Sequence, residues 1–280
     1  MRTLLAALIG LGAATGCAYP VAGADPARSN PTPRTTPTHG PAAAQPATGT
    51  ARLILAELSQ VRVIAARPDV PGYKRDQFGQ TWTDDHAGRG GHNGCDTRND
   101  VLAAQLTGVQ YRDRSRCVVI AGTMPTDPYT GRRIEFRKAA ATKVQIDHLY
   151  PLARAWDMGA ADWPLQRRVD FANDQAANLV AVDGPANASK NDDGPGEWLP
   201  INRSYRCTYV LRYLQVASKY TLPITAADRD AAHAITRSCP QEAELARRRA
   251  RGPTIRLEKP KSAAAGVMPG ELSKLCQLEP

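Results

Sequence analysis

Four polar residues in the middle of the chain are of the types that metal-assisted hydrolysis requires. Asp147 and His148 are adjacent, Asn178 follows His148 after thirty residues, and Asn187 follows Asn178 after nine. A neutral histidine can accept a proton from water near pH 7. An aspartate and an asparagine offer the oxygen ligands that Mg²⁺ or Mn²⁺ prefers. This set could cleave a phosphodiester bond, with His148 as general base and Asp147 and Asn187 as ligands of one divalent cation.

Two residues of the same segment have less specific roles. We expect Asn178 to hold the loop that orients His148. Lys190, twelve residues after Asn178, could contact phosphate, or it could be a solvated residue on a helix face. A single Asp-His pair is common in proteins, and an Asn and a Lys three residues apart on a helix are a weaker signal. The prediction therefore rests on the order of the whole set rather than on one residue.

The sequence around these residues predicts the elements that position them. The apolar segment VQIDH is typical of a strand that ends at the Asp-His pair, and residues 179–182 predict a second strand. A following helix would carry Asn187 and Lys190, and residues 156–177 would be a helical insertion between the strands. Elsewhere the pattern of apolar residues predicts helices over 51–66, 205–220 and 229–238 and short strands over 117–121 and 134–136.

The N-terminus has the layout of a signal peptide. Met1 and Arg2 precede the apolar run LLAALIGLGAA, which is too short to span a bilayer. The run ends in Ala-Thr-Gly before Cys17, which resembles the lipobox of bacterial lipoproteins, where the cysteine is lipidated. We therefore expect an exported protein with a signal peptide over 1–17. It would be either a cell-surface lipoprotein, touching the membrane only through its lipid anchor, or a secreted protein after simple cleavage.

Composition divides the rest of the chain into three regions. Residues 18–50 are rich in Pro, Ala and Thr and predict a flexible linker. Residues 51–241 form the expected domain, and residues 242–280 a basic, loosely ordered tail. The formal net charge is +9, but residues 51–241 hold 25 Lys and Arg against 21 Asp and Glu. This mild excess does not by itself indicate a nucleic-acid partner.

Five cysteines follow the leader, and their spacing argues against structural zinc because no C-x-x-C pair is present. An oxidising compartment favours disulfides instead. The sequence leaves the connectivity open. The local pairings are Cys95–Cys117 and Cys207–Cys239, and they leave Cys276 over.

From residue 73 to residue 239, about 60% of the chain, the sequence resembles a group of secreted bacterial HNH nucleases. The matching phrases are KRDQFGQTW, NGCDTRNDVL, DPYTG, VQIDHLYPLARAWDMGA, FANDQAANLVAVDG and EWLPINRSYRCTYV. In HNH nucleases a β-hairpin followed by a helix grips one divalent cation. An Asp-His pair ends the first strand, a middle Asn starts the second, and a final Asn or His lies on the helix.

The resemblance implies an α+β fold: a ββα-metal (HNH) core with additional helices and short strands, stabilised by two disulfides. It also implies an endonuclease that uses a divalent metal, Mg²⁺ or Mn²⁺, to cut nucleic acid, and we expect DNA rather than RNA. It names no protein partner. The alternative is a catalytically inactive, nucleic-acid-binding surface lipoprotein, or an envelope protein in which the motif is coincidental. Retention of both Asp147 and His148 argues against an inactive copy.

Two further groups of polar residues leave alternatives open. Arg98, beside an expected disulfide, could line a nucleic-acid groove or belong to a structural hydrogen-bond network. His86 and His92, with Asp84 and Asp85, could bind a metal in the Gly-rich segment DDHAGRGGHNG. A flexible surface loop is the favoured interpretation of that segment.

Overall fold

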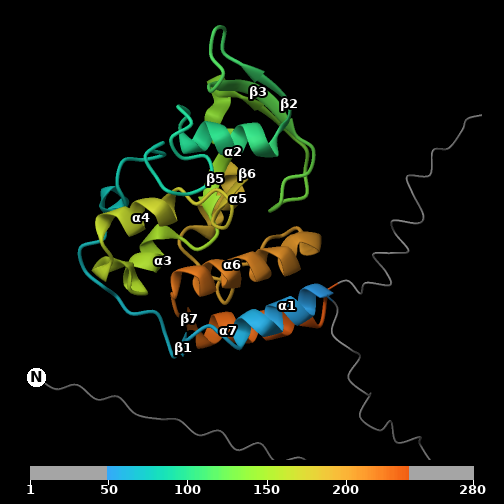
Figure 1. Ribbon diagram of the computed structural model, residues 1–280. Helices are drawn as coiled ribbons and strands as arrows, with labels where there is room; N and C mark the ends of the chain where they lie inside the picture. Colours follow the sequence, from blue (N-terminus) through green and yellow to red (C-terminus); the bar gives the residue numbers. More distant parts are fainter. Residues whose placement is uncertain (1–48, 240–280) are drawn as a thin grey trace, which may run out of the picture. The chain divides into compact units, whose positions relative to one another are not determined.

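Helices and short strands alternate through residues 49–239, the part of the chain that the computed structural model describes (Figure 1). The predicted α+β class is confirmed. The candidate lipidation site Cys17, Cys276 and most of the linker and tail lie outside the described residues. The helices are α1 (Gly49–Leu58), α2 (Thr97–Gln105), α3 (Leu152–Asp157), α4 (Leu165–Ala172), α5 (Gly184–Lys190), α6 (Arg206–Tyr220) and α7 (Ala226–Thr236), with short 3-10 turns η1 (Arg75–Phe78), η2 (Lys138–Lys143), η3 (Ala160–Asp162) and η4 (Arg203–Tyr205).

The described strands form three small sheets. The strands β2 (Thr107–Tyr111), β3 (Val119–Met124) and β4 (Ile134–Arg137) make an antiparallel sheet in that order. The short strands β1 (Val63–Ile64) and β7 (Ile224–Thr225) pair in parallel. The strands β5 (Val144–His148) and β6 (Leu179–Asp183) pair antiparallel, and α5 follows β6 directly.

The β5–β6 pair is buried on both of its faces. Val180 and Val182 pack into the larger core, which is built mainly from α1, α3, α6 and α7. Leu179 and Ala181 pack into a smaller core with α2 and the three-stranded sheet. Successive residues of a strand point to opposite faces, so the pair separates the two cores. The polar residues at the end of β5 are therefore held in a rigid setting.

The start of α5 is fixed by its first residues. The Asp183 side chain accepts a hydrogen bond from the Ala186 backbone amide at 2.9 Å, which satisfies one of the free amides of the first turn. A Cβ atom on Gly184 would lie 2.0 Å from the Thr142 carbonyl oxygen, so only glycine allows the approach to the segment before β5. As a result, the helix begins at the end of β6 and places Asn187 beside β5.

The first described helix completes the larger core from the far end of the sequence. Figure 1 shows α1 lying along α6 and α7, and its buried Ala51 and Ile54 belong to the same core cluster. The next strand, β1, pairs with β7. None of the described helices is long and apolar enough to cross a bilayer.

Both predicted disulfides are confirmed. Cys95 is bonded to Cys117, which links the loop before α2 to the start of β3. Cys207 is bonded to Cys239, which links the first turn of α6 to the segment after α7. Loops of these lengths each contribute roughly 3 kcal/mol to stability through the entropy of the unfolded chain.

Candidate active site

Asp147 lies at the end of β5 with both carboxylate oxygens held by buried donors. The Tyr129 hydroxyl donates to one oxygen, and the Lys190 ammonium donates to the other at 3.0 Å. All three side chains are buried. Burial raises the pKa of Asp147 above its ordinary value, while the Lys190 charge and the Tyr129 hydrogen bond oppose that rise. The carboxylate orientation is thus fixed from two sides.

The ring of His148 is fixed in one tautomer. Its Nε2 lies 2.8 Å from the Ala172 carbonyl oxygen, and because a carbonyl only accepts, Nε2 carries the hydrogen. Nδ1 then holds the lone pair and has no hydrogen-bond partner among the described residues. Burial, followed by the nearby charge of Arg75, lowers the pKa of His148 to about 3. The imidazole is therefore neutral near pH 7, and the lone pair of Nδ1 is available to a water molecule.

Trp82 covers one face of that imidazole. The two rings are parallel within 7°, with centroids 5.5 Å apart. Trp82 has a positive φ of 57°, a conformation that costs free energy for a bulky residue. Ring stacking and the Ala172 hydrogen bond together restrict the rotation of the His148 side chain.

Asn178 lies where β6 begins and is completely buried. Its side-chain oxygen accepts from the Tyr150 backbone amide at 2.9 Å, and its amide group donates to the Tyr150 carbonyl at 3.3 Å. Its backbone carbonyl accepts from the Leu149 amide at 2.8 Å. These bonds hold the two residues that follow His148 in place.

Asn187 reaches the same region from α5. Its amide nitrogen donates to the Gln145 side chain at 2.8 Å. That bond determines which way the amide group is turned and leaves its oxygen without a hydrogen-bond partner among the described residues. Asp147, His148 and Asn187 all line one surface depression, which we call the main hollow. Arg75, Phe78, Trp82, His148 and Ala172 line a second depression, the side hollow, which meets the first at His148.

The structure places the two basic residues whose roles the sequence left open, Lys190 and Arg98. Lys190 is not a solvated residue on a helix face. Its side chain has no exposed area, and it donates to Asp147 and, at 3.0 Å, to the His148 carbonyl. Such a cation orients Asp147 and is not available to phosphate. Arg98 is partly buried and donates to the carbonyls of Ala141 and Val144, which favours the structural role of the two considered.

The Gly-rich segment before α2 is also more ordered than expected. His86 is buried, where its Nδ1 accepts from the Gly88 amide at 3.2 Å. Asp84 accepts from the backbone amides of Asn93 and Gly94. Within residues 49–239, no cluster of three or more His, Cys, Asp or Glu side chains could hold a metal ion. The segment is a hydrogen-bonded loop around a structural histidine.

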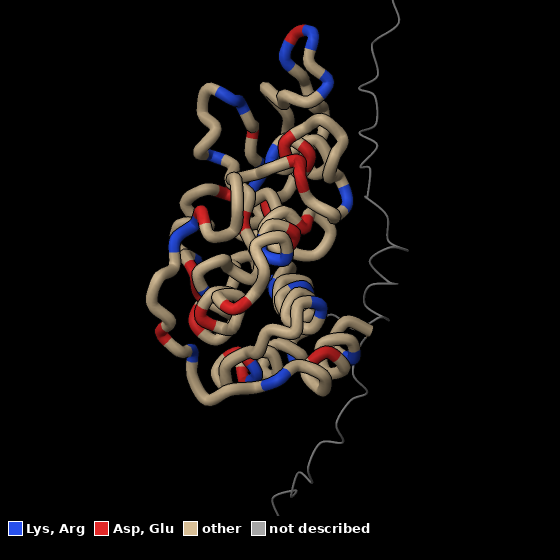
Figure 2. The backbone as a smooth tube through the Cα atoms, turned by 60° about the vertical axis from the view of Figure 1, so that its left-hand side comes forward, with Lys and Arg blue, Asp and Glu red and all other residues tan. Residues whose placement is uncertain are grey.

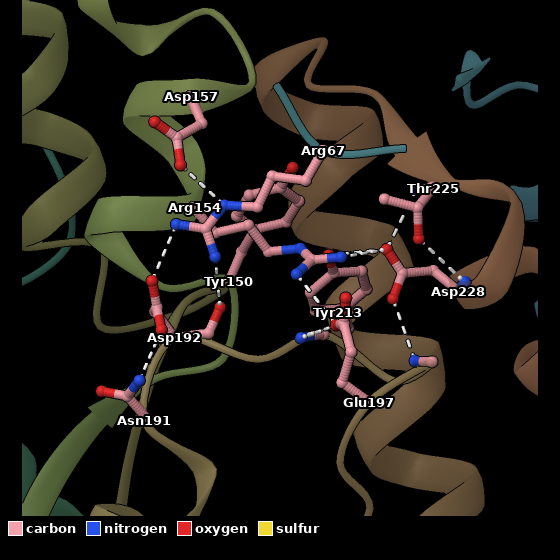
Figure 3. A network of polar contacts seen from close by, with 12 residues as sticks. Arg67, Tyr150, Arg154, Asp157, Asn191, Asp192, Glu197, Tyr213, Thr225 and Asp228 are labelled. Carbon is pink, nitrogen blue, oxygen red and sulfur yellow. Dashed lines mark hydrogen bonds and ion pairs between the residues drawn. The ribbon is translucent and has the colours of Figure 1, made fainter. Parts of the chain in front are cut away.

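An ionic network that includes the buried Arg154 and Asp228 adjoins the main hollow through Asp192 (Figure 3). Arg154, whose side chain is only 1% exposed, pairs with Asp228 at 2.7 Å and with Glu197 at 3.0 Å. Arg67 bridges Asp157 and Asp192, at 2.6 and 2.7 Å. Because Asp192 lines the main hollow, the network fixes the wall formed by the segment after α5.

Three residues of this site were not predicted from the sequence: Arg75, Trp82 and Tyr129. The first two lie in KRDQFGQTW and the third in DPYTG, phrases that carry the family resemblance. Neither phrase by itself predicts a role in the active site, because the residues that these three side chains contact there are distant in the sequence. The phrases themselves were the only available signal.

Comparisons with known proteins agree with a nuclease-related origin. Residues 96–233 match the family described as "GmrSD restriction endonucleases, C-terminal domain". The chain is 36% identical over 214 residues to an "Uncharacterized secreted protein" of the fungus Arthroderma benhamiae, an alignment that covers 75% of this chain and 93% of the relative. This relative is fungal, whereas the sequence phrases resemble bacterial proteins. No solved structure matches the chain. Residues 96–233 are therefore similar to the C-terminal domain of GmrSD restriction endonucleases, and the chain belongs to the same family as the secreted fungal relative.

Proposed function

We propose that this protein is a metal-dependent endonuclease of the HNH type that hydrolyses phosphodiester bonds in nucleic acid. The observation that carries the proposal is the convergence of Asp147, His148 and Asn187 on the main hollow, with the Nδ1 of His148 free to accept a proton. The order β5, β6, α5 is the order of elements expected of a ββα-metal core and supports the proposal. The match to a restriction endonuclease family supports the same activity and favours DNA over RNA.

The residues present fit a hard divalent cation such as Mg²⁺ or Mn²⁺. Asp147 contributes a carboxylate whose orientation is fixed by Tyr129 and Lys190. Asn187 contributes an amide oxygen that its bond to Gln145 leaves available. A small number of protein ligands is usual for such a cation, because Mg²⁺ keeps several of its water ligands and also binds the phosphate of the substrate. When bound, the cation would shield the charge that develops on the phosphate and stabilise the leaving oxygen.

The chain's own residues would perform the remaining steps. The Nδ1 of His148 accepts a proton from water as the water oxygen forms its bond to phosphorus. The bond from phosphorus to the ester oxygen then breaks, and solvent protonates that oxygen. The hydrogen bond to Ala172 keeps Nε2 protonated, so Nδ1 is the basic nitrogen throughout. Asn178 preserves this geometry by holding the backbone after His148.

A plasmid-nicking assay tests the proposal and the need for metal. The full chain should convert supercoiled plasmid to relaxed circles with Mg²⁺ or Mn²⁺, and excess EDTA should abolish the reaction. A parallel assay on RNA should show slower cleavage. Plasmid binding without cleavage, whichever divalent cation is added, would instead indicate the inactive binding protein.

The similarity to a secreted relative supports export of this chain, and lipidation at Cys17 stays a prediction.

Replacing Asn187 with alanine should weaken Mn²⁺ binding by about 10–100-fold, the size of effect reported even for residues that only support metal ligands. Titration of the full chain followed by Mn²⁺ electron paramagnetic resonance measures this directly. Asn187→Asp is the matched control, because it keeps an oxygen at the same place. Nicking activity of Asn187→Ala should recover as Mn²⁺ is raised, since mass action refills a weakened site. Unchanged Mn²⁺ affinity in Asn187→Ala would remove this residue from the metal site.

A further inference from the structure

Arg75 occupies a special position among the basic residues near His148. It lines both the main hollow and the side hollow, and it is the sole Lys or Arg among the described residues that line either one. Its side chain projects from the first residue of η1 and is exposed. A phosphodiester that reaches His148 through the main hollow therefore lies beside this guanidinium.

The positive charge of Arg75 is not neutralised by the protein. Neither carboxylate that lines the main hollow forms an ion pair with Arg75, since Asp147 pairs with Lys190 and Asp192 pairs with Arg67. No ion pair or side-chain hydrogen bond of Arg75 occurs among the described residues. Its five N–H donors are therefore available to a ligand.

One aromatic ring fixes Arg75 relative to His148. The Arg75 guanidinium carbon is 5.8 Å from the centre of the Trp82 ring, within the range of a cation–π contact. The same Trp82 ring is stacked on His148. The charge of Arg75 also lowers the pKa of His148, second only to burial, which agrees with their proximity. The cation is thus held beside the proposed general base.

We propose that Arg75 binds a phosphate group of the nucleic acid beside His148, by donating hydrogen bonds from its guanidinium to non-bridging phosphate oxygens. This inference rests on the proposed nuclease function. An arginine suits the task, because its planar fork matches two phosphate oxygens at once.

The modest charge of the domain makes such a local cation necessary. In the view of Figure 2, basic and acidic residues are interspersed along the tube, and residues 51–241 carry a small net positive charge. A general positive field would not concentrate phosphate at His148. A single unpaired guanidinium at the meeting point of the two hollows would do so.

Binding of a labelled DNA duplex to the full chain in EDTA, followed by fluorescence anisotropy over a range of salt concentrations, tests the proposal without cleavage. Arg75→Gln should weaken binding by about 10–100-fold, as expected for a lost hydrogen bond to a charged group. It should also reduce the slope of log K against log salt by about one, the signature of one lost phosphate contact. Arg75→Lys should keep the slope while losing part of the affinity.

Lys74→Gln is the matched control, because Lys74 is the exposed neighbour of Arg75 and lines neither hollow. It should leave affinity, slope and nicking rate close to those of the unmodified chain. The proposal is wrong if Arg75→Gln matches Lys74→Gln in both affinity and slope, while the unmodified chain binds DNA. A chain that binds DNA but never cuts it would refute the nuclease function and leave the Arg75 comparison valid. A chain that does neither would refute both.

Discussion

Replacing His148 with alanine should lower the rate of DNA nicking by about 10²–10⁴-fold, the usual cost of losing a general base. Binding of Mn²⁺ and of DNA should change little, because His148 is proposed to contact only the attacking water. The buried ring packs against Trp82 and bonds to Ala172, so alanine would also leave a cavity. His148→Gln is the better second variant, since its longer amide can still donate to the Ala172 carbonyl and preserve the local fold.

The decisive comparison is between the base variants and a ligand variant over a metal titration. Asp147→Asn is preferable to Asp147→Ala, because alanine would leave the buried Lys190 ammonium without a partner. High Mn²⁺ should restore part of the activity of Asp147→Asn and none of the activity of His148→Gln. The reverse pattern would exchange the assigned roles of base and ligand. Wild-type rates in both variants would place the active site elsewhere.

Replacing Arg154 with methionine should destabilise the domain by about 3–5 kcal/mol, the cost of leaving one member of a buried ion pair alone. Asp228 would stay buried without its cation, although it would keep the backbone donors Thr225 and Gly196, each at 3.0 Å. The free energy of unfolding can be measured by urea denaturation. If both unfolding curves are fitted with the same m-value, the urea midpoint of Arg154→Met should be much lower than that of the unmodified chain.

Arg229→Met provides the control for loss of an arginine. Arg229 pairs with Asp230 at 2.8 Å, but the two side chains are 43% and 67% exposed. Exposed pairs contribute about 0–1 kcal/mol, so this variant should unfold almost as the unmodified chain does. A loss below about 1 kcal/mol in Arg154→Met as well would mean that the network of Figure 3 is not a source of stability.

Elements with a strong local pattern could be predicted from the sequence, and those set by distant pairing could not. The strands 144–148 and 179–183 and the helix 206–220 lie close to their predicted positions. The helix predicted over 51–66 ends at Leu58, because the next residues pair with β7 from the far end of the chain. Local apolar spacing contains no information about that partner.

The same distinction applies to the site. Asp147, His148 and Asn187 could be chosen because they fall on one hairpin and the helix that follows it. Whether Lys190 faces water or Asp147 depends on how α5 packs on β5. The position of Lys190 in the sequence of the helix does not determine that packing. Arg75 comes from a segment far earlier in the chain, and only the folded structure brings it to His148.

The pairing of the two ends of the described domain has a consequence for the order in which the chain can fold. Helix α1 is made first during synthesis, yet its core partners α6 and α7 and the strand that pairs with β1 are made last. Contacts between such distant segments form slowly, since a long loop must close before they are made. An incomplete chain therefore exposes the apolar side of α1, with Ala51 and Ile54, until nearly the whole domain has been made.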